Sequence, residues 1–238
     1  MAEPSRGILD HAVAATPLAV LDFETTGLHA GGDRVVEVSV ARVEPGGEPR
    51  LVLDTLIDPQ RPVAATFIHG IRDDDVIDAP TFREIAGALI DALDGCVLAA
   101  YNAYFDMRFL DWEMRAAGVA ERPPYLCLMY LRSLLGLGRR CSLDEACRVH
   151  RIEWSRAHAS TAHTAAADAL AAAGLWARYL PAMVDREIRT FGDLAAQRRY
   201  KFTESFIRPP LRAPALWPSA DRPRLKPRGR AWAMPVDA

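Results

Sequence analysis

The stretch from Leu18 to Leu28 constrains the fold of this 238-residue chain more than any other part of the sequence. It begins with a run of apolar residues that is too short to cross a membrane and is bounded by Gly27, a pattern typical of a buried central strand. Two acids, Asp22 and Glu24, interrupt the run at its carboxyl end. Because side chains two positions apart in a strand share a face, the two carboxylates are expected to project together.

The Asp22–Glu24 pair would place two like charges side by side, which is unfavourable unless something neutralises them. A divalent cation would do so, and carboxylate oxygens are hard ligands that favour magnesium or manganese over zinc. The pair therefore predicts a metal-binding strand end. The simpler interpretation is a strand end with two solvated acids, and motifs further along the chain have to decide between the two.

The rest of the chain shows a pattern that predicts a mixed sheet flanked by helices. After a turn at 27–32, two strands are expected to form an antiparallel meander with the first, and a further short strand is expected among the helices. These strands cover 34–43, 51–57 and 96–100. The expected helices cover 81–93, 103–117, 126–135, 142–149 and 161–180, and a short amphipathic piece covers 191–200.

Several helix ends are indicated by their capping residues. Thr81, with Glu84 three residues later, predicts a capping box, and Asn102 and Ser142 are expected to cap the helices that follow them. Pro181 is expected to lie beyond the end of the Ala-rich helix at 161–180, because proline cannot continue a helix without loss of a hydrogen bond.

Composition divides the chain into a folded domain at 17–206 and two looser ends. Residues 1–16 show no clear pattern and are expected to form a loose leader. Residues 207–238 are expected to form a flexible tail, since seven prolines and seven basic residues there accompany only two acids. The net charge of −2 argues against a wholly basic nucleic-acid coat but allows a local basic surface. Four cysteines without a CxxC pair, and no signal peptide or membrane span, predict a cytoplasmic protein with reduced thiols.

Two further acids and one histidine are candidates for the same chemistry. Asp106 falls in the first turn of an expected helix, where the helix dipole alone would also favour an acid. Asp168 lies among seven alanines, and an acid in so apolar a helix needs either solvent or a partner. The small neighbours would let that helix approach the strand that carries Asp22. His163 lies roughly 140° from Asp168 around a regular helix, so the two share a site only if His163 sits at the helix entry. As a lone histidine it would be an ordinary surface residue.

Together these residues give the chain a resemblance to the DEDDh (DnaQ-like) family of 3′→5′ exonucleases, in particular to the epsilon-type proofreading subunits of bacterial DNA polymerase III. The resemblance covers roughly residues 17–180 and implies an α/β fold with an RNase H-like, mixed five-stranded sheet flanked by helices. One position departs from the family pattern, because Tyr101 stands where a histidine is usual. The matching motifs are Asp22-Phe-Glu-Thr-Thr-Gly-Leu28, Asn102-Ala-Tyr-Phe-Asp106 and His163-x4-Asp168, with Ile68-His-Gly-Ile71 between the first two.

The resemblance also implies roles for individual residues. Two divalent ions, Mg²⁺ or Mn²⁺, would be held by Asp22, Glu24, Asp106 and Asp168, with Asp22 bridging the pair. His163 would take the proton from the attacking water, a role that suits a side chain titrating near neutrality.

For the substrate, the resemblance implies that the backbone at Thr25 and Thr26 meets the terminal 3′ hydroxyl and that Leu28 wedges between the last two bases. Gly27 belongs to the same motif, although a plain turn glycine is an equally good interpretation. Further implied contacts to the terminal nucleotide come from His69, Asn102 and Phe105. For His69, a structural loop histidine is the alternative.

The leading hypothesis is a metal-dependent exonuclease that releases nucleoside monophosphates from single-stranded or 3′-unpaired nucleic acid, with DNA expected over RNA. A 3′→5′ exoribonuclease is the alternative within the enzyme class, because no base-reading motif separates the two. A second class is a nuclease fold that binds nucleic acid without catalysis, against which the five intact catalytic positions count. A third possibility is that the carboxylates have a purely structural role. The tail could tether a polymerase or another protein, hold nucleic acid, or be inert.

Overall fold

Strand β1 (Leu18–Thr25), formed by the apolar run of the first motif, occupies the centre of a five-stranded sheet. The computed structural model describes residues 7–120, 122–152, 164–212 and 224–228. Strands β2 (Val35–Val43) and β3 (Arg50–Leu56) complete an antiparallel meander, whereas β4 (Val97–Ala100) and β5 (Tyr125–Cys127) run parallel to β1. The strand order is β3-β2-β1-β4-β5, so the predicted mixed five-stranded sheet is confirmed.

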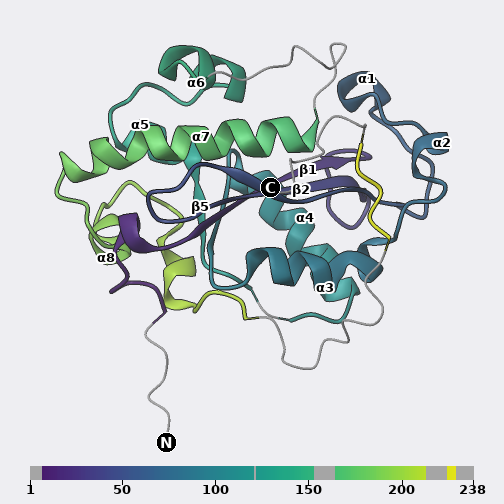
Figure 1. Ribbon diagram of the computed structural model, residues 1–238, viewed down its shortest axis with the longest axis horizontal. Helices are drawn as coiled ribbons and strands as arrows, with labels where there is room; N and C mark the ends of the chain where they lie inside the picture. Colours follow the sequence, from purple (N-terminus) through teal and green to yellow (C-terminus); the bar gives the residue numbers. More distant parts are fainter. Residues whose placement is uncertain (1–6, 121, 153–163, 213–223, 229–238) are drawn as a thin grey trace, which may run out of the picture.

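Helices cover both faces of the sheet (Figure 1). On one face α7 (Ala165–Val184) crosses the strands, and α5 (Leu128–Leu134) and α6 (Leu143–His150) pack against it. The opposite face is covered by α3 (Phe82–Leu93) and α4 (Ala103–Ala116). None of the described helices is both long and apolar enough to span a bilayer.

Strand β1 supplies two separate cores because its side chains alternate between the faces. Leu18 and Val20 pack in the core on the α7 side, whereas Ala19 and Leu21 pack in the core on the α3 and α4 side. Continuing the alternation places Asp22 on the same face as α7. The sequence pattern of the strand therefore decides which helix the first catalytic candidate faces.

Small residues let α7 lie directly on the sheet. Its alanines at 165, 166, 169, 171, 172 and 173 are buried, and the helix contacts β1, β2 and β3. The helix begins at Ala165, after Thr164, whose side-chain oxygen accepts a hydrogen bond from the Ala167 N–H (3.4 Å). The helix was predicted to end before Pro181, but it includes this residue. Pro181 lies in the last turn, where it removes the hydrogen bond of its own missing N–H. Its carbonyl still accepts a hydrogen bond from the Asp185 N–H (3.0 Å).

Other boundaries follow the capping signals or correct them. The capping box of Thr81 and Glu84 is present, and Ser142 Oγ accepts from the Glu145 N–H (3.3 Å), so both predicted helix starts are confirmed. The helix predicted from 126 begins at Leu128 instead, because the preceding residues form β5 and pair with β4. A three-residue apolar run is compatible with either a strand or a helix, and here its parallel pairing with β4 makes it a strand.

Five short helices complete the fold of the described residues. Only the region of α8 was predicted, as part of an amphipathic piece at 191–200, and the others were missed because single turns depend on tertiary contacts rather than on local pattern. They are η1 (Val13–Ala15), α1 (Thr66–His69), α2 (Asp73–Val76), α8 (Phe191–Ala195) and η2 (Thr203–Ile207).

The outer edge of β5 is closed by side-chain hydroxyl groups. Ser205 Oγ accepts from the Tyr125 N–H (3.1 Å) and lies 3.1 Å from the Tyr125 carbonyl oxygen, while its proton also has the Phe202 carbonyl as an acceptor at 2.8 Å. The Tyr200 hydroxyl contacts Cys127 in the same way, at 2.8 Å from the amide nitrogen and 3.3 Å from the carbonyl oxygen. The segment after α8 therefore completes this edge without adding a strand.

The two ends of the chain are less loose than expected where they are described. In the predicted leader, Ile8 and Val13 are buried and the Ile8 N–H donates to the Phe206 carbonyl (2.9 Å). In the predicted tail, Leu211 is buried and a second piece, 224–228, lies beside β3. Isolated apolar residues and free backbone groups at both ends thus find partners on the domain, which composition alone does not reveal.

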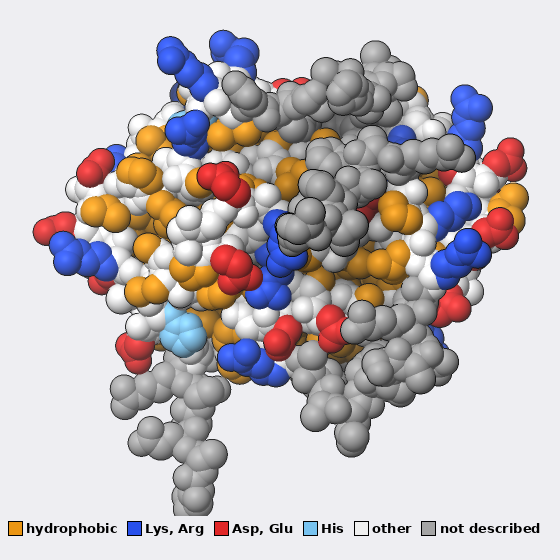
Figure 2. Space-filling model, in the orientation of Figure 1, with side chains coloured by type: hydrophobic (Ala, Val, Ile, Leu, Met, Phe, Trp, Pro, Cys, Tyr) orange, Lys and Arg blue, Asp and Glu red, His pale blue; other side chains and the backbone are white. Residues whose placement is uncertain are grey.

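On the face drawn in Figure 2, acidic and basic side chains are interspersed.

Candidate metal and nucleic-acid site

Asp22, Glu24 and Asp168 meet at the carboxyl end of β1. Each offers one carboxylate oxygen, and the three atoms lie within 4.8 Å of one another. β1 contributes two of these acids and the first turn of α7 the third. Glu24 and Asp168 are buried and Asp22 is half-buried. The two predicted motifs, 146 positions apart between Asp22 and Asp168, therefore form one cluster.

Asp106 lies beside this cluster rather than within the group of three. The parallel pairing of β4 with β1 brings the start of α4 to the same edge of the sheet, and Asp106 is buried in its first turn. The backbone N–H groups of Asp106 itself and of Phe23 offset part of the rise in the pKa of the Asp106 carboxyl. The negative charge of Asp168 acts on Asp106, so the four predicted acids share one electrostatic environment.

Burial raises the pKa of these acids, and their mutual repulsion adds to the effect. For Asp22, burial raises the pKa well above its usual value, followed by the charges of Asp106, Asp168 and Glu24. Burial raises the pKa of Glu24 to about 8, with further increases from Glu37 and Asp168. The pKa of Asp106 rises to about 7, again chiefly through burial. Such a cluster retains protons near neutral pH and gives them up when a cation binds.

We expect the metal-free protein to lose stability as the pH rises from about 5 to about 8. The folded state binds more protons than the unfolded chain between the ordinary carboxyl pKa and the raised values of Asp106 and Glu24, so the free energy of unfolding falls across this window. Urea unfolding in EDTA at both ends of the window should show a fall of about 2 kcal/mol or more. Millimolar Mg²⁺ should reduce the fall, because the cation replaces the protons. A stability in EDTA that stays constant or rises with pH would contradict this account.

Glu37 is a buried acid of the site that sequence reasoning missed. It lies opposite Glu24 on β2, its side chain is fully buried, and its Oε2 accepts from the Ala165 N–H (3.2 Å) at the start of α7. Burial raises the pKa of Glu37 to about 7. The available signal was a lone acid in an otherwise apolar strand, sharing a face with Ser39.

The turn after β1 is held by its own side chains. Thr25 Oγ1 donates to the Gly27 carbonyl (2.6 Å), and Thr26 Oγ1 donates to Asp33 Oδ1 (3.2 Å). A Cβ atom at Gly27 would lie 2.6 Å from the Asp33 carboxylate, so a larger residue at this position would have to displace the Asp33 side chain. Leu28 lies beyond the turn with 67% of its surface exposed. Both threonine hydroxyls are thus committed within the turn, while Leu28 is accessible from solvent.

The ring of His69 is engaged within its own loop. Its Nε2 lies 3.1 Å from the Ala64 carbonyl, and its Nδ1 accepts from the Ile71 N–H (3.1 Å). These two contacts require the neutral tautomer with the proton on Nε2, and burial lowers the pKa of the ring accordingly. His69 therefore orders the segment around α1, and the backbone of Thr25 also acts on its ring.

Asn102 and Phe105 lie at the start of α4. Asn102 occupies the N-cap position and is exposed, but its side chain makes no capping bond within the described helix, contrary to the expectation. The half-buried Phe105 packs against Phe109, with ring centroids 5.0 Å apart. Of the predicted site residues, His163 lies outside the described part of the chain; in the sequence it directly precedes Thr164, the N-cap of α7.

Tyr101, which replaces the usual histidine, belongs to the core. It is 7% exposed, and its hydroxyl contacts the carbonyl oxygens of Cys141 (2.9 Å) and Ser142 (3.0 Å) just before α6. The residue therefore joins β4 to the segment that begins α6, on the side of the sheet covered by α7.

We expect Tyr101→His to lower stability while kcat stays within about tenfold of the wild-type value. The substitution breaks the buried hydroxyl contacts, at a cost of about 1–3 kcal/mol, without touching the acidic cluster. Urea unfolding and single-turnover cleavage at saturating substrate measure the two effects. Tyr104→His is the matched control, because Tyr104 is 66% exposed on α4. A collapse of kcat in a stably folded Tyr101→His protein would show that the phenol contributes to the chemical step.

A mixed sheet with acids from β1, α4 and α7 at one edge defines the class of RNase H-like nucleases. The exonuclease family RNase_T matches residues 19–176, and the chain belongs to this family. The nuclease domain of 3′hExo, a DEDDh family member bound to rAMP, has the same fold, with a TM-score of 0.60 at 15% identity over 75% of this chain and 98% of that one. Exonuclease X in complex with 5′-overhanging duplex DNA gives a TM-score of 0.52 at 23% identity, over 71% of this chain and 93% of that one.

Curated relatives point the same way. The chain is 35% identical over 203 residues to a DNA polymerase III subunit epsilon-like protein of Rhodobacter capsulatus, and the match covers 80% of this chain but 28% of that protein. It is 32% identical over 173 residues to the DNA polymerase III subunit epsilon of Escherichia coli, covering 66% of this chain and 68% of the relative. The predicted resemblance to DEDDh exonucleases is confirmed, although the chain spans under a third of the Rhodobacter relative.

Proposed function

We propose that this chain is a metal-dependent 3′→5′ exonuclease of the proofreading or repair type that acts on DNA and releases nucleoside monophosphates. The observation that carries the proposal is the convergence of three carboxylate oxygens within 4.8 Å at the end of the central strand, with Asp106 beside them. Membership of the exonuclease family supports the reaction class, and the epsilon-type relatives support DNA as the polymer.

The proposed cofactors are two Mg²⁺ or Mn²⁺ ions. The residues present fit such ions, because the cluster is made of hard oxygen donors only and its acids repel one another without a cation. Asp22, Glu24 and Asp168 would hold one ion, with Asp22 shared with a second ion that Asp106 supports. Such an ion pair supplies an activated water and neutralises charge on the phosphate and the leaving 3′ oxygen.

The protein groups have separate proposed tasks. His163 takes the proton from the attacking water, and in the sequence it lies five positions before Asp168. The backbone at Thr25 and Thr26 binds the terminal sugar, and the exposed Leu28 separates the last two bases. Further nucleotide contacts are proposed for Gly27, His69, Asn102 and Phe105. Both ring nitrogens of His69 already have partners in its own loop, so its contact with the nucleotide would use other atoms of the residue.

A 5′-labelled single-stranded oligonucleotide tests the reaction. With Mg²⁺ or Mn²⁺ the purified protein should convert it to a ladder of products shortened from the 3′ end, and EDTA should abolish the reaction. Activity that persists in EDTA, or internal cleavage without a ladder, would rule out the scheme. Binding of the oligonucleotide without any cleavage would favour the non-catalytic alternative.

DNA should be hydrolysed faster than RNA of the same sequence, by at least about tenfold in kcat/KM. A ribose at the terminal position needs a partner for its 2′ hydroxyl, but the hydroxyls of Thr25 and Thr26 are committed within the turn. The other proposed neighbours, Leu28 and Phe105, are apolar. An unpaired hydroxyl costs about 1–3 kcal/mol, enough for the stated ratio. Matched 3′-unpaired DNA and RNA substrates decide the matter, and equal rates or an RNA preference would favour the exoribonuclease alternative.

A polymerase is the proposed protein partner, since the epsilon relatives are named as subunits of DNA polymerase III. The tail at 207–238 would provide the contact. Co-elution of the full chain with the polymerase subunit of the same cell in size-exclusion chromatography tests the association.

A further inference from the structure

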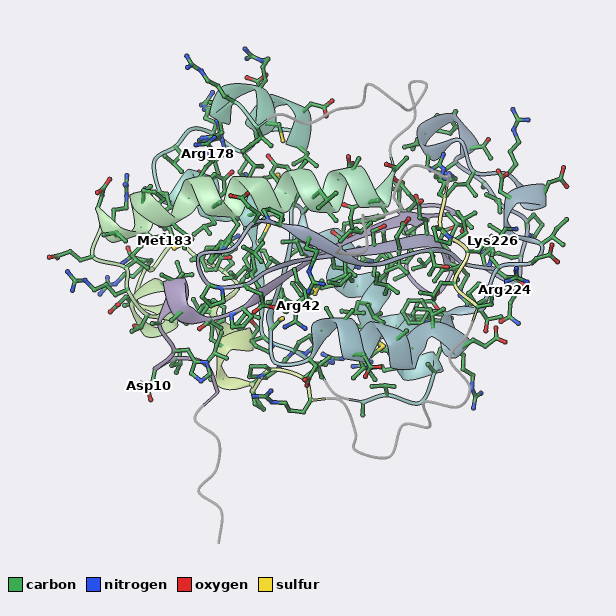
Figure 3. The ribbon with its side chains drawn as sticks, viewed as in Figure 1. Asp10, Arg42, Arg178, Met183, Arg224 and Lys226 are labelled. Atoms are coloured by element: carbon green, nitrogen blue, oxygen red, sulfur yellow. The ribbon has the colours of Figure 1, made fainter. Side chains whose placement is uncertain are left out.

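The segment 224–228, within the Pro/Arg-rich tail, is docked on the edge strand β3. The Lys226 carbonyl accepts from the Leu56 N–H (2.9 Å), and the Lys226 N–H donates to Thr55 Oγ1 (2.9 Å). In Figure 1 this yellow segment lies near α1 at the end of the sheet where α7 begins, and Figure 3 labels Arg224 and Lys226 on it. Backbone pairing with β3 therefore fixes the position of this part of the tail.

Docking brings the side chain of Arg228 to the rim of the acidic site. Its Nη1 lies 3.3 Å from Glu37 Oε2, and its Nη2 donates to the His69 carbonyl. The Arg228 side chain is 23% exposed and that of Glu37 is 1% exposed, so the ion pair is largely shielded from solvent. The same Glu37 oxygen accepts from the Ala165 N–H at the start of α7 (3.2 Å).

These contacts join three parts of the chain that surround the cluster. Arg228 links the end of α1 to Glu37 on β2, and Glu37 links β2 to the first turn of α7, which carries Asp168. We infer that Arg228 is a positioning residue for the exonuclease site: it holds Glu37 against the start of α7 and so fixes the turn that presents Asp168. This inference rests on the function proposed above.

The need for a cation at this point follows from the neighbouring charges. Glu37 lies directly opposite Glu24 on the adjacent strand, and both are buried. A buried carboxylate that loses its cationic partner is no longer held in place, and its contact with the positive end of α7 weakens. Among the described residues Glu37 Oε1 accepts no hydrogen bond, so Oε2 makes both stabilising contacts. Small displacements of a catalytic group have large kinetic effects, about 100-fold for 1 Å.

If Arg228 competed with the metal ions instead of positioning the site, its removal would change the rate and the Mg²⁺ requirement in the opposite direction. If its charge only competed with the metal ions for the acids, removing it would strengthen Mg²⁺ binding and raise the rate. If it positions the start of α7, removing it lowers kcat and raises the Mg²⁺ concentration needed for half-maximal rate, because Asp168 is misplaced. The two roles therefore differ in the sign of both measured changes.

The first test is single-turnover cleavage by the full chain carrying Arg228→Ala, across a range of Mg²⁺ concentrations. We expect kcat to fall about tenfold or more and the half-maximal Mg²⁺ concentration to rise, while KM for the oligonucleotide changes less than about twofold. Millimolar guanidinium should restore part of the lost rate in this variant. Arg224→Ala is the matched control, since Arg224 is an exposed arginine on the same segment and should behave like the wild type.

The second test needs no metal and no activity. In metal-free protein, amide hydrogen exchange at Ala165 should be faster in Arg228→Ala than in the wild type or Arg224→Ala. Lys226→Pro, which removes the N–H that donates to Thr55, should reproduce both effects with the arginine present. Unchanged amide exchange at Ala165 in Arg228→Ala would overturn the inference. Faster cleavage by Arg228→Ala at a lower Mg²⁺ concentration would do so as well. An inactive wild-type chain would instead refute the proposed function and leave the exchange experiment to judge Arg228.

Discussion

The full chain carrying Asp22→Asn is expected to cleave single-stranded DNA at least about a thousandfold more slowly than the wild type at saturating Mg²⁺. Asp22 belongs to the group of three with Glu24 and Asp168, and the charges of both acids and of Asp106 act on its carboxylate. Loss of a shared ligand disables the whole ion pair rather than one ion. Single-turnover kinetics at several Mg²⁺ concentrations measures the effect.

Asp54→Asn is the matched control for that substitution. Asp54 lies in the same row across the sheet, two strands from Asp22, but its Oδ1 accepts from Ser39 Oγ (2.7 Å) and it is not part of the group of three. Its rate should stay within about tenfold of the wild type. Asp22→Asn should also be more stable than the wild type in EDTA, because one mutually repelling carboxylate is gone. An Asp22→Asn rate above about a tenth of the wild-type value would remove Asp22 from the set of metal ligands.

His163→Ala is expected to lower kcat by about 10²–10⁴ while Mn²⁺ binding, measured by calorimetry, stays intact. The range is the usual contribution of a positioned general base, and the metal ligands are left in place. His29→Ala is the control, since the His29 side chain is 82% exposed on the turn after β1. A wild-type rate for His163→Ala would exclude this histidine from the mechanism, and loss of Mn²⁺ binding would make it a ligand instead.

The central part of the site was predictable because it depends on short-range geometry. Alternation along β1 places Asp22 and Glu24 on one face, whatever the rest of the fold does. The parallel strands β1 and β4 bring Asp106 to the same edge, and the alanines around Asp168 allow α7 to approach it. Periodicity and residue size are both readable from sequence and allowed these acids to meet, and the resemblance to the DEDDh exonucleases joined the four into one expected site.

The outer part of the site could not be predicted because its contacts join distant positions. Arg228 and Glu37 are 191 residues apart, and no local pattern connects a basic residue in a Pro-rich tail to an acid in a buried strand. The structural role of Tyr101 depends equally on a distant partner, the backbone before α6. Composition predicted a tail without a core of its own. It gave no information about edge strands that offer unpaired backbone groups to such a tail.

The hydroxyl groups that close β5 have a consequence for self-association. An edge strand with free amide and carbonyl groups is a template on which a strand of a second molecule pairs. Here Ser205 and Tyr200 lie against those groups of Tyr125 and Cys127, and Pro123 and Pro124 directly precede the strand. Removal of both hydroxyls would leave these groups without those partners and available to a strand of a neighbouring copy.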